Sequence, residues 1–256
     1  MRWLGPILTV LLAVLAAVIL LGASPGIVLA VGTLGKFLYL LVAAVVSTGV
    51  VKKFEPGTPS RTAWQLLSGG LIALCLGQTC FVYYQFVQGI EIPFPSFADI
   101  FFMVAYPLLI AALVMFLRAY TASGFPIGPA SERVWLAAAV TVVCLAIGYP
   151  ILMPLVRNPG EPLETLLNLL YPVLDFLLFV PAVLLIRISL RFRGGAVWKV
   201  WATLLAGFVF LCAADTLFAY FDQLGRADLV NMVDATYLLA YGMFGLGVLY
   251  QRELLA

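Results

Sequence analysis

The sequence predicts an all-α polytopic membrane protein with about eight transmembrane helices, arranged as two tandem parallel four-helix repeats. Composition is the first observation behind this prediction: 64% of the 256 residues are hydrophobic and 10% are charged. A soluble domain carries about 25% charged residues. Because a water-soluble globule cannot bury that much apolar surface, the bilayer must act as the solvent. The composition argues against a soluble enzyme, a secreted disulfide scaffold, a disordered chain and a nucleic-acid binder.

The second observation is a series of apolar windows. A transmembrane helix needs about 20 apolar residues, and the windows that meet this length are 4–22, 27–51, 63–88, 95–117, 133–153, 164–187, 198–222 and 230–250. Pro, Gly and charged residues fill the breaks between them, as is typical of loops. We therefore expect a single membrane domain over 1–256, with repeat one at 1–125 (the first four helices) and repeat two at 126–256 (the last four).

An internal repeat is the third observation. An offset of 137 residues aligns identical residues, namely Trp64/Trp201, Leu67/Leu204, Gly70/Gly207, Leu74/Leu211, Cys75/Cys212, Thr79/Thr216, Phe81/Phe218 and Tyr83/Tyr220. An offset of 135 then aligns Asp99/Asp234, Ala105/Ala240 and Tyr106/Tyr241. Since four helices are an even number, both halves would cross the membrane in the same direction.

The first window also resembles a signal peptide, because Arg2 precedes an apolar run that ends in Gly-Ala-Ser. We favour a retained helix, since the second repeat contains a counterpart for it.

Basic residues predict the orientation through the positive-inside rule. With the N-terminus in the cytoplasm, only Arg157 and Arg226 lie outside, and Lys36 lies within a span. The cytoplasmic set is Arg2, Lys52, Lys53, Arg61, Arg118, Arg133, Arg187, Arg191, Arg193, Lys199 and Arg252. We therefore expect a multi-pass protein of the plasma membrane with both termini in the cytoplasm.

Several chemistries lack their usual residues. The sequence contains no histidine, which removes His-ligated haem or zinc and His-based catalysis. The four cysteines lie in apolar stretches without a CxxC spacing, as small buried side chains do. P-loop and nucleophile-elbow motifs are also missing. We therefore expect no cofactor, no bound metal and no enzymatic activity.

Asp175 and Asp215, on consecutive helices, loosely resemble the pair of intramembrane aspartyl proteases. The Gly-x-Gly expected before the second aspartate is absent, since Ala213 and Ala214 precede Asp215. This resemblance therefore does not change the expectation of a non-enzymatic protein.

Ionisable side chains within the spans are the candidate functional residues, because they are costly inside a bilayer. All of them fall in the outer half of their helices. The prediction is a polar cavity open to the outside and lined by Lys36, Gln78, Asp175 and Asp215. Amphipathic tyrosines would form its walls, namely Tyr83, Tyr171, Tyr220 and Tyr241. The alternative is an ion pair of Lys36 with Asp175 or Asp215 that only locks the bundle.

Three further acids, Asp99, Asp234 and Asp222, lie near the outer helix ends. Acids in a first turn interact favourably with the helix dipole, and Ser96 or Asn231 could cap the helices of Asp99 and Asp234. We expect these three acids to be structural caps or to form the rim of the site.

Tryptophans near the span ends are typical of the aromatic belt at the membrane interface. This expectation covers Trp3, Trp64, Trp135, Trp198 and Trp201.

Short motifs give a resemblance to a known group of proteins. They are Pro93-Phe-Pro-Ser96-Phe-Ala-Asp99 followed by Tyr106-Pro-Leu, then Tyr171-Pro-x2-Asp175, and Ala214-Asp215-x4-Tyr220. Together they resemble the multi-helix membrane sensory modules found N-terminal to diguanylate-cyclase or histidine-kinase domains in actinobacteria and archaea. The resemblance implies a sensory module of unsettled ligand. The printed sequence ends at Ala256 without an output domain, so we expect a signal to pass to a partner, or the module to work alone.

These observations favour a non-enzymatic sensory or ligand-binding module. The expected partners are the lipid bilayer, a small-molecule or lipid ligand from the outer side, and a second copy of the chain or a separate signalling protein, with no nucleic acid. A transporter or channel for an ion or small solute is the first alternative, and it would need polar residues that continue to the cytoplasmic face. A structural subunit of a membrane complex is the second.

Overall fold

The computed structural model describes residues 4–21, 24–124, 128–157, 160–225 and 229–256. Within these ranges the chain forms eight long helices and no strands. They are α1 Leu4–Leu20, α2 Pro25–Val51, α3 Pro59–Val82, α4 Ala98–Ala122, α5 Ala130–Arg157, α6 Pro162–Ser189, α7 Ala196–Gln223 and α8 Val230–Leu254. A π-helical turn, Tyr83–Gln88, prolongs α3, and a short 3₁₀ turn, Leu190–Phe192, follows α6. The all-helical prediction is thus confirmed.

Seven of the described helices, α2 to α8, are long and apolar enough to cross a membrane. The first helix has 17 residues, so it is shorter than the predicted window of 4–22 and falls below the length of a full span. The other helices begin and end within about five residues of their windows, once the π-helical turn is counted with α3; α4 ends later than predicted, at Ala122, and α3 begins earlier, at Pro59. Thr58 explains that early start, because its side chain accepts a hydrogen bond from the Arg61 backbone N–H.

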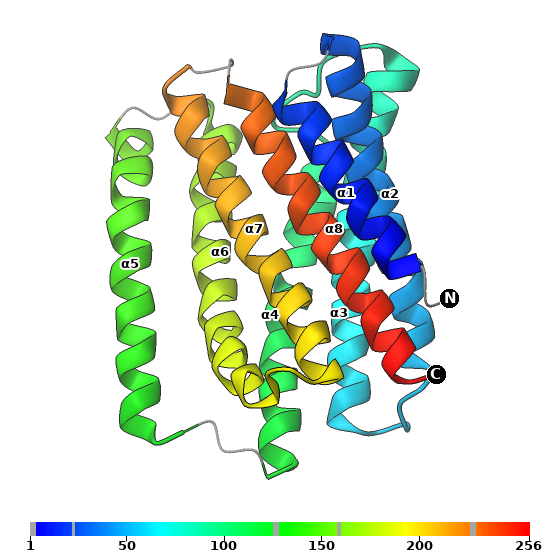
Figure 1. Cartoon of the computed structure of the whole chain (residues 1–256). Helices are drawn as coiled ribbons and strands as arrows, with labels where there is room; N and C mark the ends of the chain where they lie inside the picture. Colours follow the sequence, from blue (N-terminus) through cyan, green and yellow to red (C-terminus); the bar gives the residue numbers. More distant parts are fainter. Residues whose placement is uncertain (1–3, 22–23, 125–127, 158–159, 226–228) are drawn as a thin grey trace.

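Six helices pack in a closed ring in the order α2, α3, α4, α6, α7 and α8, with α8 returning to α2. The helices alternate in direction, so that loops join neighbouring ends of the bundle (Figure 1). Helix α1 packs outside the ring on α8 and α2, whereas α5 stands at the opposite edge and packs mainly on α6 (Figure 1). The two outer helices therefore do not occupy equivalent positions, and the arrangement as two repeats stays a prediction.

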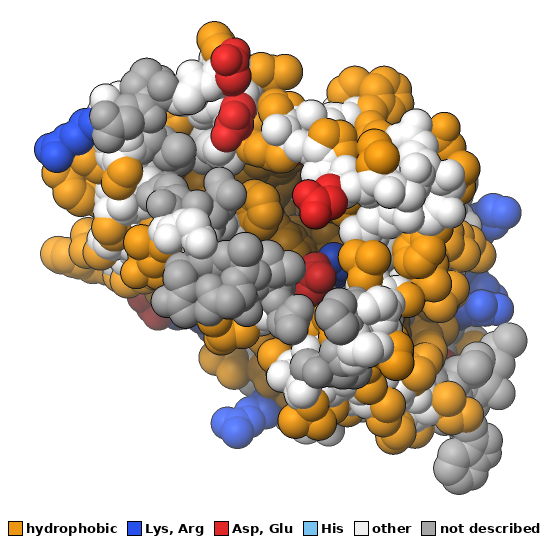
Figure 2. Space-filling model, turned by 90° about the horizontal axis from the view of Figure 1, so that it is seen from above, with side chains coloured by type: hydrophobic (Ala, Val, Ile, Leu, Met, Phe, Trp, Pro, Cys, Tyr) orange, Lys and Arg blue, Asp and Glu red, His pale blue; other side chains and the backbone are white. Residues whose placement is uncertain are grey.

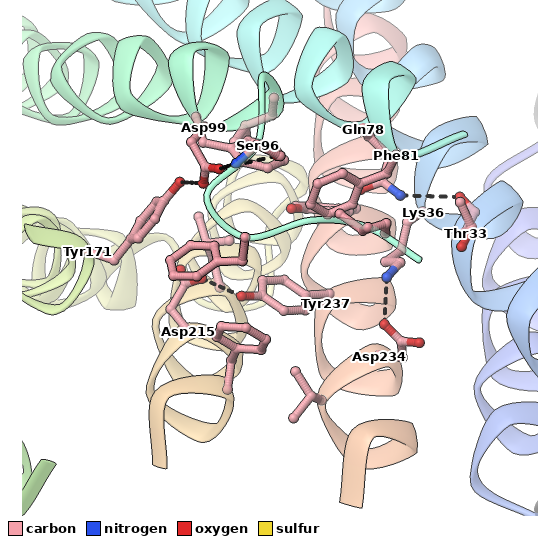
Figure 3. A pocket seen from close by; sticks show the side chains of 18 of the residues that line it. Thr33, Lys36, Gln78, Phe81, Ser96, Asp99, Tyr171, Asp215, Asp234 and Tyr237 are labelled. Carbon is pink, nitrogen blue, oxygen red and sulfur yellow. Dashed lines mark hydrogen bonds and ion pairs between the residues drawn. The ribbon is translucent and has the colours of Figure 1, made fainter. Parts of the chain in front are cut away.

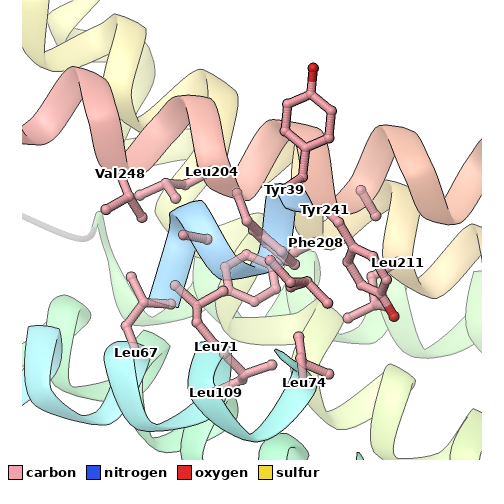
Figure 4. Close-up of a cluster of buried hydrophobic side chains, with 14 of the residues drawn as sticks. Tyr39, Leu67, Leu71, Leu74, Leu109, Leu204, Phe208, Leu211, Tyr241 and Val248 are labelled. Carbon is pink, nitrogen blue, oxygen red and sulfur yellow. The ribbon is translucent and has the colours of Figure 1, made fainter. Parts of the chain in front are cut away.

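The core fills the centre of the ring. Fully buried side chains meet there, among them Leu71 of α3, Leu109 of α4, and Leu204 and Phe208 of α7 (Figure 4). One end of this core is aromatic, because the Phe116 ring packs edge-on against both Trp64 and Trp201. The expectation that Trp64 and Trp201 lie in the interface belt is wrong: they are 2% and 5% exposed, since their side chains point into the ring.

Trp135, by contrast, is exposed on α5, and Trp3 lies outside the described residues.

Glycines let the helix pairs of the two halves approach closely in the same way. A Cβ added at Gly70 of α3 would lie 2.5 Å from Leu109 on α4. A Cβ added at Gly207 of α7 would lie 2.6 Å from Phe244 and 3.1 Å from the Ala240 backbone oxygen on α8. The same offsets that align the sequence relate these two contacts.

The α7–α8 contact gives a stability test. We expect Gly207→Ala to lower the free energy of unfolding in detergent by about 1–3 kcal/mol, because the backbone of Ala240 and the buried Phe244 ring cannot move away cheaply. The matched control is Gly49→Ala on α2, where an added Cβ meets nothing within 4 Å. That control should be neutral or stabilising by about 0.5–1 kcal/mol. Equal stability of the two variants would contradict the close approach.

Candidate functional site

A cavity of about 310 Å³ lies at the end of the ring where α4 and α8 begin and α3 and α7 end. Seen from that end, the surface is hollowed, and acidic and basic side chains lie at and within the hollow (Figure 2). Leu74 and Leu211 line the bottom of the cavity and belong to the hydrophobic core beneath it. Its walls are mainly apolar, and they include Leu29, Phe81, Phe94, Phe102, Pro172, Phe218 and Val233.

An ion pair occupies one wall. The Lys36 ammonium group on α2 donates to Asp234 Oδ1 on α8 at 2.6 Å (Figure 3). The side chains are 8% and 24% exposed, so the pair is largely shielded from solvent. The Lys36 nitrogen also lies 5.8 Å from the centre of the Tyr237 ring, within the range of a cation–π contact. The pair joins two helices that are far apart in sequence.

A second acid, Asp99, lies at the opposite wall in the first turn of α4. Its Oδ2 accepts the Ser96 backbone N–H at 2.6 Å and the Ser96 hydroxyl at 3.2 Å. The Ser96 hydroxyl oxygen in turn accepts the Ala98 backbone N–H, so Ser96 and Asp99 form a hydrogen-bonded turn at the start of α4. The other oxygen, Oδ1, accepts the hydroxyl of Tyr171 on α6 at 2.5 Å (Figure 3).

These two contacts correspond to each other. The offset of 135 residues that relates Asp99 to Asp234 also relates Lys36 to Tyr171. Each acid at a helix start therefore bonds to the equivalent position of the other predicted half, once across α4 and α6 and once across α8 and α2. These are the two places where the halves meet in the ring.

A hydrogen-bonded chain of tyrosines and aspartates lies at the third side. The Tyr106 hydroxyl on α4 is 2.6 Å from Asp215 Oδ2 on α7 and 2.8 Å from Asp175 Oδ1 on α6. The Tyr237 hydroxyl of α8 donates to Asp215 Oδ1 (Figure 3). Asp215, Tyr106 and Tyr237 line the cavity, whereas Asp175 lies behind Tyr106 and is 1% exposed.

Amides and a hydroxyl complete the polar lining near the α2–α3 contact. The Thr33 hydroxyl on α2 donates to the side-chain oxygen of Gln85. Gln78 on α3 donates to the Thr33 backbone oxygen at 3.4 Å (Figure 3). The π-helical turn after α3 places Gln85 on the cavity side.

A loop covers part of the cavity mouth. Gly89 ends the π-helical turn with a φ of 67°, a left-handed conformation that glycine adopts without a Cβ clash. The chain then crosses the cavity between Asp99 and Lys36 before α4 begins (Figure 3). Phe94 of this loop packs edge-on against Phe218 on α7, with ring centres 6.2 Å apart. The loop therefore connects the two sides of the mouth.

Most of the residues predicted from sequence meet at this cavity. Those that line it are Lys36, Gln78, Asp215, Tyr171, Tyr241, Asp99 and Asp234. The alternative in which Lys36 pairs with Asp175 or Asp215 is wrong, because its partner is Asp234. Asp175 does not line the cavity, since Tyr106 lies between them.

Two tyrosines were placed wrongly. Tyr83 and Tyr220 are absent from the cavity lining and are 48% and 44% exposed. Tyr83 is the first residue of the π-helical turn. The offset of 137 residues aligns it with Tyr220, and both exposed side chains point away from the ring. The side chain of Asp222 lies outside the described residues, as does that of Asn231, the expected cap of α8.

Sequence reasoning missed several lining residues, namely Thr33, Gln85, Tyr106, Asn168 and Tyr237. The repeat could have identified Tyr106, because it aligns with Tyr241. Helical spacing could have identified Tyr237 and Thr33, which lie four residues before Tyr241 and three before Lys36. The sequence holds no comparable signal for Gln85, whose orientation depends on the π-helical turn.

No protein-family model, curated protein or solved structure matches this chain. Among the described residues, no cluster of three or more Cys, Asp or Glu side chains could hold a metal ion. The geometry of the cavity is therefore the basis for any statement about function.

The Lys36–Asp234 pair gives a test of the site. We expect Lys36→Met to lower the free energy of unfolding by about 1–3 kcal/mol, because Asp234 loses its partner in a largely shielded place. The double variant Lys36→Met/Asp234→Asn should recover part of that loss, as contacting residues are not additive. Denaturant unfolding in detergent measures both, and Lys53→Met at the exposed opposite end is the control. Additive effects of the two substitutions would contradict the pairing.

Proposed function

We propose that this chain is a non-enzymatic integral membrane module that binds a small molecule or lipid in the cavity and serves as a sensory component. The observation that carries the proposal is a mainly apolar cavity that holds a few charged and polar groups and ends on an apolar core. Leu74 and Leu211 close its bottom, and Leu71, Leu109 and Phe208 follow beneath them (Figure 4). A site that opens at one end of the bundle suits reception better than passage.

Charge distribution supports a cavity that faces outward. Most of the described basic residues at helix ends, such as Lys52, Arg118 and Arg252, lie at the end of the bundle opposite the cavity, whereas Arg157 at the end of α5 lies at the cavity end. By the positive-inside rule the end opposite the cavity is cytoplasmic. Both termini would then lie in the cytoplasm of a cell whose plasma membrane holds the protein.

The lining indicates an amphipathic ligand. The cavity volume of about 310 Å³ falls at the lower end of typical ligand pockets, which measure about 300–1,000 Å³. Aromatic and aliphatic side chains supply most of the wall, while Lys36, Asp234 and Asp215 supply the charges. Such a surface suits a molecule with an apolar body and a polar or charged group that reaches the Lys36–Asp234 pair.

The resemblance to membrane sensory modules fits this cavity. Most of the residues that carry it meet at one place, with Tyr220 as the exception: Ser96 and Tyr171 both bond to Asp99, and Tyr106 joins Asp175 to Asp215. Motifs that build one site are what a ligand-receiving module requires. A second copy of the chain or a separate signalling protein would then read the occupied state.

Cysteine accessibility tests the outward opening. In a chain whose native cysteines are replaced by alanine, we expect Gln85→Cys and Phe94→Cys to react with a membrane-impermeant maleimide added outside cells. Glu55→Cys, in the loop at the opposite end, should react only in inverted vesicles, and Leu71→Cys in the core from neither side. Labelling of Gln85→Cys from both sides would favour a transporter or channel instead.

A thermal-shift screen tests ligand binding. We expect a member of a panel of alkylamines, fatty acids and zwitterionic amphiphiles to raise the melting temperature, since a ligand at about 100 times its Kd contributes about 2.7 kcal/mol. Ala219→Phe, which fills the cavity, should abolish the shift. Ala138→Phe on the exposed face of α5 is the matched control and should keep it. A shift that survives in Ala219→Phe would contradict binding in this cavity.

A further inference from the structure

The chain of tyrosines and aspartates contains three hydrogen bonds, one more than its two tyrosine hydroxyls can donate. Three hydrogen bonds join Tyr237 to Asp215, Tyr106 to Asp215 and Tyr106 to Asp175. A tyrosine hydroxyl has a single proton to donate, and an ionised carboxylate can only accept. Two tyrosines therefore supply two of the three bonds. The third bond requires a proton on one of the carboxyl groups.

The surroundings of the two carboxyl groups indicate which one holds the proton. Both oxygens of Asp215 have a tyrosine hydroxyl as neighbour, and the side chain borders the cavity. Asp175 is 1% exposed, and its Oδ2 is the buried side-chain oxygen without a hydrogen-bond partner among the described residues. An ionised carboxylate with an orphaned oxygen is far costlier to bury than a neutral acid.

Among the residues that the structure describes, no lysine or arginine is paired with Asp175. The described neighbours of Asp175 on the helices packed against α6 are Tyr106 of α4, Asp215 and the thiol of Cys212 on α7, and the thiol of Cys144 on α5. Lys36, the basic side chain among the described cavity residues, pairs with Asp234 instead. If Asp175 and Asp215 were both ionised, their carboxylates would repel each other across the Tyr106 hydroxyl, with no cation paired to either among the described residues to offset the repulsion.

We propose that Asp175 is a buried proton-binding site, linked to the cavity by Tyr106. The neutral acid donates its proton from Oδ1 to the Tyr106 oxygen, and Tyr106 donates its own proton to Asp215 Oδ2. A shift of both protons along these bonds leaves Asp175 ionised and Asp215 neutral, with the number of protons unchanged. Asp215 can then exchange its proton with water in the cavity. The proposal does not depend on the cavity binding a ligand.

Infrared spectroscopy of the full chain in lipid nanodiscs tests this proposal. At neutral pH we expect a C=O stretching band of a protonated carboxylic acid, with the shift in D₂O that exchange of its proton produces. Asp175→Asn should remove the band. Asp99→Asn is the matched control, because Asp99 is also buried but receives three donated hydrogen bonds, and it should leave the band intact. A wild-type protein without the band, or a band that survives in Asp175→Asn, would overturn the proposal.

A second variant keeps the test decisive if Asp175→Asn does not fold. Tyr106→Phe removes the hydroxyl that accepts the Asp175 proton while it keeps the ring. The band should remain and move to the frequency of a more weakly hydrogen-bonded acid. An unchanged band position in Tyr106→Phe would show that the proton does not lie between Asp175 and Tyr106.

Discussion

A polar side chain that lies inside a bilayer must find its partners within the protein, and this constraint organises the cavity end of the bundle. Lys36 is paired with Asp234 there, and the carboxylate of Asp99 accepts hydrogen bonds from Ser96 and Tyr171. The Lys36–Asp234 and Tyr171–Asp99 contacts each bridge helices from different halves of the chain. The hydrogen bonds that make the polar residues tolerable therefore also close the helical ring.

The opposite half of the ring is mainly apolar, and the polar side chains buried there also find partners, as in the hydrogen bond between the Ser47 and Ser68 hydroxyls at 2.9 Å. Most of that half is held by packing, and close packing in a membrane favours small residues at helix contacts. Gly70 and Gly207 allow that approach, and the Trp64–Phe116–Trp201 cluster fills the wider space. The result is a cavity with a firm apolar base, a geometry that suits reception of a ligand.

The two halves of the chain do not carry equivalent polar residues, so the two walls of the cavity differ in chemistry. Asp215 occupies the position that Gln78 holds in the first half, and Asp175 has no acidic counterpart there. One wall therefore carries an amide that bonds to the backbone, whereas the other carries linked carboxyl groups.

Composition and helical periodicity were enough to predict the class of protein, the positions of the long helices and the clustering of Lys36, Asp99, Asp215 and Asp234 at one end of the bundle. Those properties depend on how favourably each apolar segment transfers to a bilayer and on the rise per residue of a helix, and both follow from short stretches of sequence. The partners were not predictable, because Lys36 and Asp234 are 198 residues apart and pairing depends on which helices become neighbours. Tyr83 and Tyr220 show the same limit, since a residue's depth follows from sequence but its rotation about the helix axis follows from packing. Only the ring of helices decided that Tyr106 would separate Asp175 from the cavity.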